Sequence, residues 1–245
     1  MIALVTGASS GIGEATARRL ARDPAAHVVL VARREERLRE LASQLPAATV
    51  IAADLTDDAA PAQIAACVEE EHDRLDLLVN NAGAGWRSSF ADGGWENVRR
   101  TMEINFDGVV RLTEALLPLL RRSAPSAIVN VASTAGRITR AESSAYAASK
   151  FALAGWTDGL HLEERSGGVH VGLVLPGFVA TEGFPQSALV RRPHTRWLVS
   201  RPAVVAEAIV ACGPGGKAER YVPRPYYLTA LARVVAPRLV RRVLG

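Results

Sequence analysis

Short runs of apolar residues alternate with amphipathic stretches along most of this 245-residue chain, and this alternation constrains its fold more than any other feature. Each apolar run is continuous and rich in Val, Ile and Leu, as is typical of parallel strands that are buried on both faces. A strand–helix–strand order implies right-handed crossovers with helices on both faces of the sheet. The sequence therefore predicts an α/β fold with a doubly wound parallel sheet of about seven strands.

No linker and no internal repeat divides this pattern, so we expect residues 1–245 to form a single domain. Residues 183–201 show no clear period and follow a strand end, which predicts a substrate loop. The predicted strands cover residues 2–6, 27–32, 49–53, 75–79, 127–132, 169–175 and 220–222. The predicted helices cover residues 11–22, 35–45, 61–71, 144–165 and 203–212, with two more inside 95–122.

Composition argues against several classes of protein. The two cysteines, Cys67 and Cys212, form no CxxC pair, and the five histidines show no ligand spacing, so we expect neither a disulfide framework nor a metal site. No apolar run reaches the roughly 18 residues that a membrane span needs. The first predicted strand begins at residue 2 without a cleavable signal before it, which predicts a cytoplasmic protein.

The net charge of +4 conceals an asymmetry, because residues 1–182 carry a net charge of −5 and residues 183–245 carry +9. The segment 226–245 is apolar and basic, and Pro237 is expected to bend or break it. Its halves are amphipathic, which suits a subunit interface or a peripheral contact with a membrane, while a solvated basic face is the alternative. Nucleic acid is not an expected partner, since neither a zinc finger nor an aromatic-rich basic strand occurs.

A glycine-rich segment, TGASSGIG at residues 6–13, follows the first predicted strand and opens the first predicted helix. A helix N-terminus presents backbone N–H groups and a partial positive charge that suit a pyrophosphate. Glycines let the backbone turn sharply and approach phosphates closely. The segment predicts a dinucleotide site, although a turn that only packs the helix against the strand would have the same pattern and the spacing differs from GxGxxG.

The residues after the second predicted strand indicate which dinucleotide fits. An acidic residue there binds the ribose 2′-hydroxyl of NAD, whereas an arginine accommodates the 2′-phosphate of NADP. Here Arg33 and Arg34 follow the strand, and no acidic residue precedes Glu35. Cations are disfavoured at a helix N-terminus, so this placement favours NADP(H) over NAD(H), with two solvated arginines as the alternative.

Tyr146 and Lys150 are spaced i, i+4 near the start of the predicted helix 144–165, so both side chains lie on one helix face. A phenol titrates near pH 10, and a neighbouring lysine cation favours the phenolate and lowers this pKa. Lys150 and Lys217 are the only lysines among 29 basic residues, which suggests that position 150 requires a compact ammonium group. The pair predicts acid–base chemistry.

Further motifs accompany this pair, and most of them follow predicted strands, where ligands bind in open parallel sheets. In chain order they are DLTD at 54–57, NNAG at 80–83, Asn105, Ser133 and PGFVAT at 176–181. With TGASSGIG and YAASK, this set resembles the short-chain dehydrogenase/reductase family over about residues 2–182. The resemblance implies a Rossmann-like fold and an NAD(P)(H)-dependent oxidoreductase that interconverts a ketone and a secondary alcohol.

The resemblance also implies a role for each matching residue. Tyr146 is the expected general acid/base, Ser133 is expected to hold the substrate oxygen, and Lys150 is expected to bind the nicotinamide ribose. Asn105 is expected to hold a water of a proton relay, although it could simply be a packed polar group. The other expected cofactor contacts, of which Asp54 and Thr181 could instead cap helices, are Gly7, Ser9, Ser10, Gly11, Ile12, Gly13, Arg33, Arg34, Asp54, Leu55, Asn81, Ala82, Gly83, Pro176, Gly177 and Thr181.

Two other functions share parts of this pattern. Epimerases and dehydratases of sugar nucleotides share YxxxK but need a larger substrate domain than 245 residues allow. A catalytically silent dinucleotide-binding regulator or scaffold would be expected to lack the tyrosine, lysine or serine. The family implies a homodimer or homotetramer, and an apolar substrate pocket is suggested by Trp86, Phe178, Phe184, Leu189 and Trp197.

Overall fold

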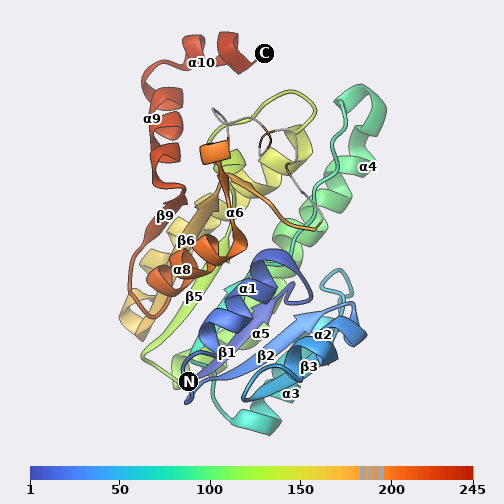
Figure 1. The fold of residues 1–245 in the computed structure, drawn as a ribbon, viewed down its shortest axis with the longest axis vertical. Coiled ribbons are helices and arrows are strands. Elements are labelled where there is room, and N and C mark those ends of the chain that lie inside the picture. The colour runs from blue at the N-terminus through green and yellow to red at the C-terminus, as the bar shows by residue number, and fades with distance from the viewer. Residues whose placement is uncertain (183–185, 187–188, 190, 192–195, 245) are drawn as a thin grey trace.

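The computed structural model describes residues 1–182, 186, 189, 191 and 196–244, and its centre is a seven-stranded parallel sheet (Figure 1). The strand order is β3-β2-β1-β4-β5-β6-β9. The second and third strands are added on one side of β1 and the later ones on the other, so the strand order reverses between β1 and β4. Such a reversal creates a crevice at the carboxyl ends of the strands. The strands are β1 (Ile2–Thr6), β2 (His27–Ala32), β3 (Ala48–Ala52), β4 (Leu77–Asn80), β5 (Ser126–Val131), β6 (Val169–Pro176) and β9 (Glu219–Val222).

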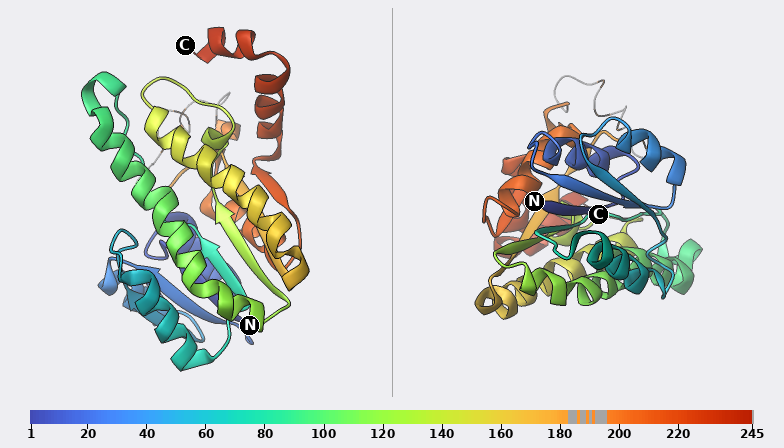
Figure 2. Two further views of the ribbon diagram at one scale, coloured as in Figure 1. Left: turned by 180° about the vertical axis from the view of Figure 1, so that it is seen from behind. Right: turned by 90° about the horizontal axis from the view of Figure 1, so that it is seen from below.

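Helices cover both faces of the sheet (Figure 2). One face packs against α1 (Gly11–Leu20), α2 (Glu35–Ala42) and α8 (Pro202–Cys212). The other face packs against α3 (Ala60–His72), α5 (Gly108–Arg122) and α6 (Ser144–Glu164). Between α3 and α5, the helix α4 (Phe90–Met102) runs into a short π-helix, η1 (Glu103–Asp107).

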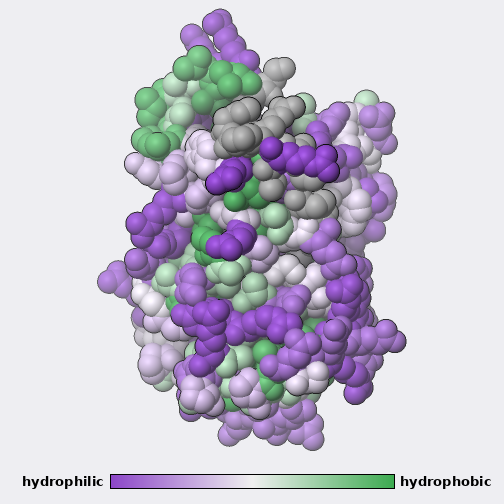
Figure 3. Space-filling view, in the orientation of Figure 1, coloured by the Kyte–Doolittle hydropathy of each residue, from purple (hydrophilic) through white to green (hydrophobic). Residues whose placement is uncertain are grey.

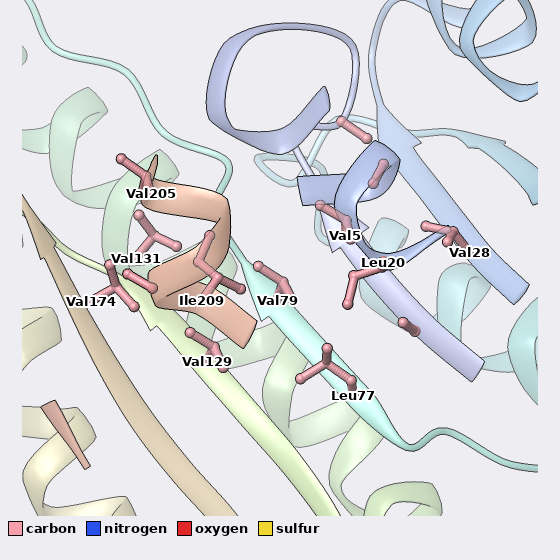
Figure 4. Close-up of a cluster of buried hydrophobic side chains, with 14 of the residues drawn as sticks. Val5, Leu20, Val28, Leu77, Val79, Val129, Val131, Val174, Val205 and Ile209 are labelled. Carbon is pink, nitrogen blue, oxygen red and sulfur yellow. The ribbon is translucent and has the colours of Figure 1, made fainter. Parts of the chain in front are cut away.

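The two hydrophobic cores explain why the strand sequences contain no polar alternation. Successive side chains of a strand point to opposite faces. In β1, Val5 therefore packs with α1 and α8, where Leu20 and Ile209 lie in the same cluster (Figure 4), while Leu4 packs on the other face with Leu116. Both faces of β1 therefore require apolar residues, and the sequence shows them at every position before the terminal Thr6.

The predicted sheet is confirmed, and each strand lies within two residues of its predicted position. Some short elements were not predicted. One is the π-helix η1, which joins the two helices that were expected inside 95–122, and the first of these, α4, begins earlier, at Phe90. Another is a small sheet of β7 (Phe178–Val179) and β8 (Val199–Ser200), of which β8 follows a 3₁₀ turn at Arg196–Leu198. Most of the expected substrate loop 183–201 lies outside the described residues.

The C-terminal segment forms two helices, α9 (Tyr227–Val235) and α10 (Pro237–Leu244), as the position of Pro237 predicts. Ala236 has φ −131° and ψ 58°, so the helix ends before the proline, which then opens the next helix. A proline is well suited to the first turn of a helix because its missing N–H has no partner to lose there. In the described part of the chain, no helix combines the length and apolar character needed to cross a membrane.

Candidate active site

A cleft of about 1150 Å³ opens at the carboxyl ends of the strands, beside the reversal between β1 and β4. Small-molecule sites usually measure about 300–1000 Å³, so this cleft has room for a large ligand and a second, smaller one. The structure brings the expected site residues together here. All of them line the cleft except Gly13 and Asn105, which lie behind its surface.

The glycine-rich segment forms the turn between β1 and α1. Gly7 has φ +65°, a left-handed conformation that favours glycine. A Cβ added to Gly13 would lie 2.2 Å from the Gly7 carbonyl oxygen, so any side chain at position 13 would force the turn open. The side chain of Ser10, the residue before α1, makes no capping hydrogen bond. The first turn of α1 therefore faces the cleft with its backbone N–H groups, as an anion site requires.

The turn is fastened to the segment that follows β4. Thr6 Oγ1 accepts hydrogen bonds from the backbone N–H groups of Asn81 and Ala82, both at 2.9 Å, and donates to the Val79 carbonyl at 3.2 Å. The Asn81 amide donates to the Thr6 carbonyl at 2.9 Å. Thr6 was not among the expected site residues, because its role depends on the pairing of β1 with β4 rather than on a motif.

Asn105 fixes the next part of the same segment. It is fully buried in η1, where it accepts a hydrogen bond from the Ala84 N–H at 2.9 Å and donates to the Ala84 carbonyl at 2.8 Å. It also donates to Ser149 Oγ at 3.1 Å. A Cβ on Gly83 would lie 2.6 Å from Asn105 Oδ1, which explains the glycine. The contacts make Asn105 a positioning residue for the cleft wall, while the expected water-holding role stays a prediction.

Substituting Asn105 by Ala is expected to lower the free energy of unfolding by about 2–3 kcal/mol, because both polar groups of Ala84 lose their partner. Binding of NADPH is expected to weaken as well, since residues 81–84 lose their support. Denaturant unfolding and a fluorescence titration with NADPH would measure the two effects. The control is Asn97→Ala, which removes another buried amide that lies outside the cleft wall. Unchanged NADPH affinity in Asn105→Ala would contradict the positioning role.

Arg33 and Arg34 lie at the edge of the cleft, between β2 and α2. The Arg34 guanidinium donates to Ser9 Oγ from Nε at 3.2 Å and from Nη2 at 3.1 Å, so a cation and a hydroxyl are joined beside the glycine turn. Arg33 lies 3.6 Å from the Asp54 carboxylate. Burial alone would raise the pKa of Asp54, but hydrogen bonds from Thr56 and the Arg33 charge lower it overall. The side chains of Arg33 and Arg34 are 73% and 47% exposed, so both remain accessible to solvent and to a ligand.

Tyr146, Ser133 and Lys150 converge at the centre of the cleft, where α6 begins beside the end of β5. The Tyr146 phenol is hydrogen-bonded to Ser133. Ser133 Oγ also lies 3.3 Å from the Pro176 carbonyl and accepts from the Ala135 N–H at 3.1 Å. The ammonium group of Lys150 is buried beneath the tyrosine and donates to the Val131 carbonyl at 3.0 Å.

The titration of this pair differs from the expectation of a lowered tyrosine pKa. Burial raises the pKa of the Tyr146 phenol, and the hydrogen bond with Ser133 opposes this only in part. Burial also lowers the pKa of Lys150 to about 8. The Lys150 ammonium lies 5.9 Å from the centre of the Tyr146 ring. Desolvation therefore outweighs the attraction that the i, i+4 spacing suggested.

The apolar end of the cleft has aromatic rings in its wall, and arginines pack against these rings. Trp86 and Phe178 line it, as predicted, and each carries an arginine against its ring: Arg100 lies 4.3 Å from the Trp86 ring centre, and Arg140 lies 5.2 Å from that of Phe178. Tyr226 and Thr229 from the C-terminal segment complete the wall. Trp197, which was also expected in the pocket, is not among the lining residues, and Phe184 lies outside the described residues.

Comparison with known proteins identifies the family to which this site belongs. A family model described as short chain dehydrogenase matches residues 1–188. The chain belongs to the short-chain dehydrogenase/reductase family. A putative ketoacyl reductase of Streptomyces coelicolor is 37% identical over 96% of this chain and 90% of that protein. An uncharacterized oxidoreductase of Bacillus subtilis is 34% identical over 99% of this chain and 71% of that protein.

Solved structures support the same assignment. A short-chain dehydrogenase from Streptomyces avermitilis superposes with a TM-score of 0.83 and 32% identity, covering 96% of this chain and 93% of that one. A variant of actinorhodin polyketide ketoreductase with NADPH gives 0.80 and 32%, covering 89% and 93%. The protein is therefore an oxidoreductase of the short-chain dehydrogenase/reductase type with a Rossmann-like fold. Among the residues described, no group of three or more His, Cys, Asp or Glu could hold a metal ion.

Proposed function

We propose that this short-chain dehydrogenase/reductase is an NADPH-preferring ketone reductase in which Tyr146 is the general acid. The observation that carries the proposal is the hydrogen-bonded pair of Tyr146 and Ser133 above a buried Lys150, in a cleft that also contains the glycine turn. The cleft, its arginine edge and the first turn of α1 fit a dinucleotide with an extra phosphate. A bound nicotinamide would supply the hydride.

The side chains of this chain would supply the proton and the orientation. Ser133 Oγ, held by the Ala135 N–H, would turn its single proton from the Pro176 carbonyl to the substrate oxygen and donate a hydrogen bond there. The Tyr146 phenol would transfer its proton to that oxygen as negative charge develops there. A raised pKa keeps the phenol protonated near neutral pH, and carbonyl reduction is the direction that consumes this proton. Lys150 would donate to ribose hydroxyls from its buried position.

The NADPH preference would come from Ser9, Arg33 and Arg34. The Ser9–Arg34 contact places a guanidinium and a hydroxyl at the end of the cleft where the adenosine ribose is expected. Arginine matches a phosphate with two parallel hydrogen bonds. The relatives support this proposal, because a ketoreductase of similar fold was crystallised with NADPH.

Substituting Arg34 by Ala is expected to weaken NADPH binding about ten- to a hundredfold, because a charged hydrogen bond contributes about 1.5–3 kcal/mol. Affinity for NADH, which lacks the phosphate, is expected to stay unchanged. Arg33→Ala is expected to act in the same direction. Arg39→Ala is the matched control, because Arg39 pairs with Glu35 on its own helix and does not line the cleft. Nicotinamide fluorescence measures the affinities, and equal NADH and NADPH affinity in the wild type would refute the preference.

Turnover tests the reductase proposal itself. Consumption of NADPH, measured by absorbance with a panel of ketones, is expected for the wild type. Tight NADPH binding without turnover of any ketone would favour a silent regulator or scaffold instead.

We also infer a homo-oligomer, because Phe151 and Leu162 expose apolar side chains on α6. Sedimentation velocity of the purified protein would measure its oligomeric state.

A further inference from the structure

The helices α9 and α10, here called the C-terminal limb (residues 227–244), extend from the body of the protein and expose an apolar face. No residue of α9 is buried. Seven large apolar residues of the limb are between 51% and 78% exposed: Tyr227, Leu228, Leu231, Val234, Val235, Leu239 and Val243. Figure 3 shows apolar side chains gathered over α9. An apolar surface of this kind marks an interaction site.

The charges of the limb are all positive. No acidic residue follows Glu219 in the sequence, whereas Arg233, Arg238, Arg241 and Arg242 lie in the limb. In α10, Leu239 and Val243 are spaced i, i+4, and Arg238 and Arg242 repeat the same spacing one residue earlier. An apolar stripe therefore lies beside a basic stripe, which is the pattern of a helix lying in the interface of an anionic membrane.

The base of the limb is fixed beside the cleft. The Tyr226 phenol donates to the Leu198 carbonyl at 3.1 Å, and its ring lies so close to Gly177 that a Cβ there would be 2.4 Å from it. Thr229, in the first turns of α9, donates to the Tyr226 carbonyl at 2.6 Å and lines the cleft. These contacts fix the position of the limb relative to the apolar end of the cleft.

A second exposed apolar surface lies at the same end of the molecule. The start of α4 reaches this end in Figure 1 and in the reversed view of Figure 2, together with α10. It carries Phe90 and Trp95, which are 70% and 69% exposed. Tryptophan and other amphipathic aromatic rings favour the level of the lipid headgroups. The exposed aromatic residues of α4 and the basic, apolar C-terminal limb therefore lie at the same end of the protein.

We propose that the C-terminal limb docks on an anionic phospholipid surface and holds the apolar end of the cleft against it. Together with the proposed reductase function, on which it rests, this docking implies a substrate class. The substrate is an apolar ketone that enters the cleft from the lipid. A second copy of this chain is a less suitable partner for the limb itself, because pairing two identical limbs would bring arginines toward arginines. A membrane with acidic headgroups satisfies the apolar and the basic stripe at once.

Co-sedimentation of the full-length protein with vesicles tests the proposal. Vesicles of mixed phosphatidylglycerol and phosphatidylcholine are expected to bind the protein, and vesicles of phosphatidylcholine alone are not. The triple variant Arg238→Gln, Arg241→Gln, Arg242→Gln is expected to bind about a hundredfold more weakly, since each arginine near an anionic surface contributes about fivefold. The double variant Val234→Gln, Val235→Gln is expected to lose binding through the apolar face.

A charge-matched control separates docking from general attraction. Arg22→Gln, Arg39→Gln and Arg122→Gln remove three exposed charges from other parts of the surface. This control is expected to keep vesicle binding. The proposal is overturned if the wild type does not bind the anionic vesicles, or if the control loses as much binding as the limb variant. It is also overturned if the double variant Val234→Gln, Val235→Gln has half the solution mass of the wild type in the absence of lipid. The apolar face of the limb would then be an interface with a second copy of the chain.

The substrate part has its own measurement. The triple arginine variant is expected to lose kcat/KM for an apolar ketone carried in anionic vesicles while keeping kcat/KM for a water-soluble ketone. Equal loss for both ketones would overturn the substrate class. Tyr146→Phe is expected to bind vesicles like the wild type while its kcat falls about a hundred- to ten-thousandfold. A failure of docking therefore remains distinguishable from a failure of the reductase proposal.

Discussion

Substituting Tyr146 by Phe is expected to lower kcat for ketone reduction about a hundred- to ten-thousandfold, the range that a positioned general acid contributes. The change removes one oxygen atom, which is hydrogen-bonded to Ser133 at the centre of the cleft. The ring itself is retained, so the packing beneath the cleft and the affinity for NADPH are expected to stay the same. Stopped-flow measurement of NADPH oxidation at saturating ketone would isolate the chemical step.

Tyr221→Phe provides the matched control for this result. Tyr221 lies in β9, its phenol is hydrogen-bonded to Arg137, and it does not line the cleft. The same chemical change there is expected to leave kcat within a few-fold of the wild type. Ser133→Ala is expected to lower kcat about a hundred- to a thousandfold, as loss of one donor to a developing oxyanion does. A Tyr146→Phe enzyme that keeps a tenth of the wild-type rate would require a different proton donor.

The sheet and the motif positions could be predicted because they depend on local sequence. In a strand such as β1, the four residues 2–5 are all apolar because both faces of the strand are buried, and that pattern is visible without a structure. The glycine turn was equally visible, since Gly7 and Gly13 allow a conformation and a close approach that other residues would obstruct. The alternation of strands and helices then places these motifs at one edge of the sheet.

The features that escaped prediction depend on contacts between distant segments. Nothing in the local pattern distinguishes the π-helix around Asn105 from an α-helix, because the difference follows from its contacts with Ala84 and Ser149. The contribution of Tyr226 to the cleft depends on the packing of its ring over Gly177. The sequence predicted a lowered pKa for Tyr146, whereas burial raises it in the structure. The spacing of Tyr146 and Lys150 reveals the charge of the lysine but not the burial of both groups.

Substituting Lys150 by Met is expected to stabilise the protein at neutral pH while abolishing most of its activity. Burial lowers the pKa of Lys150 from 10.5 to about 8, which means that the folded state holds this charge at a cost of about 3 kcal/mol at neutral pH. Loss of the hydrogen bond to the Val131 carbonyl offsets about 1 kcal/mol of the gain. A net stabilisation of about 2 kcal/mol would raise Tm by roughly 4–8 °C in a protein of this size.

The pH dependence of this gain follows from the direction of the shift. Below about pH 8 the lysine is protonated in both states, so the wild type bears the full cost. Between about pH 8 and 10.5 the unfolded state binds more protons than the folded state, and the stability of the wild type rises with pH. The advantage of Lys150→Met is therefore expected to shrink over this range. Calorimetric scans of both proteins from neutral to alkaline pH would measure the difference.

Lys217→Met is the control, because Lys217 is exposed and is the other lysine of the chain. Its substitution is expected to change stability by less than about 0.5 kcal/mol at any pH. A lower Tm in Lys150→Met would show that the hydrogen bond to Val131 outweighs the cost of burying the charge. A higher Tm together with weaker NADPH binding and lost turnover would show that position 150 keeps a buried cation for the reaction, at the expense of the stability of the fold.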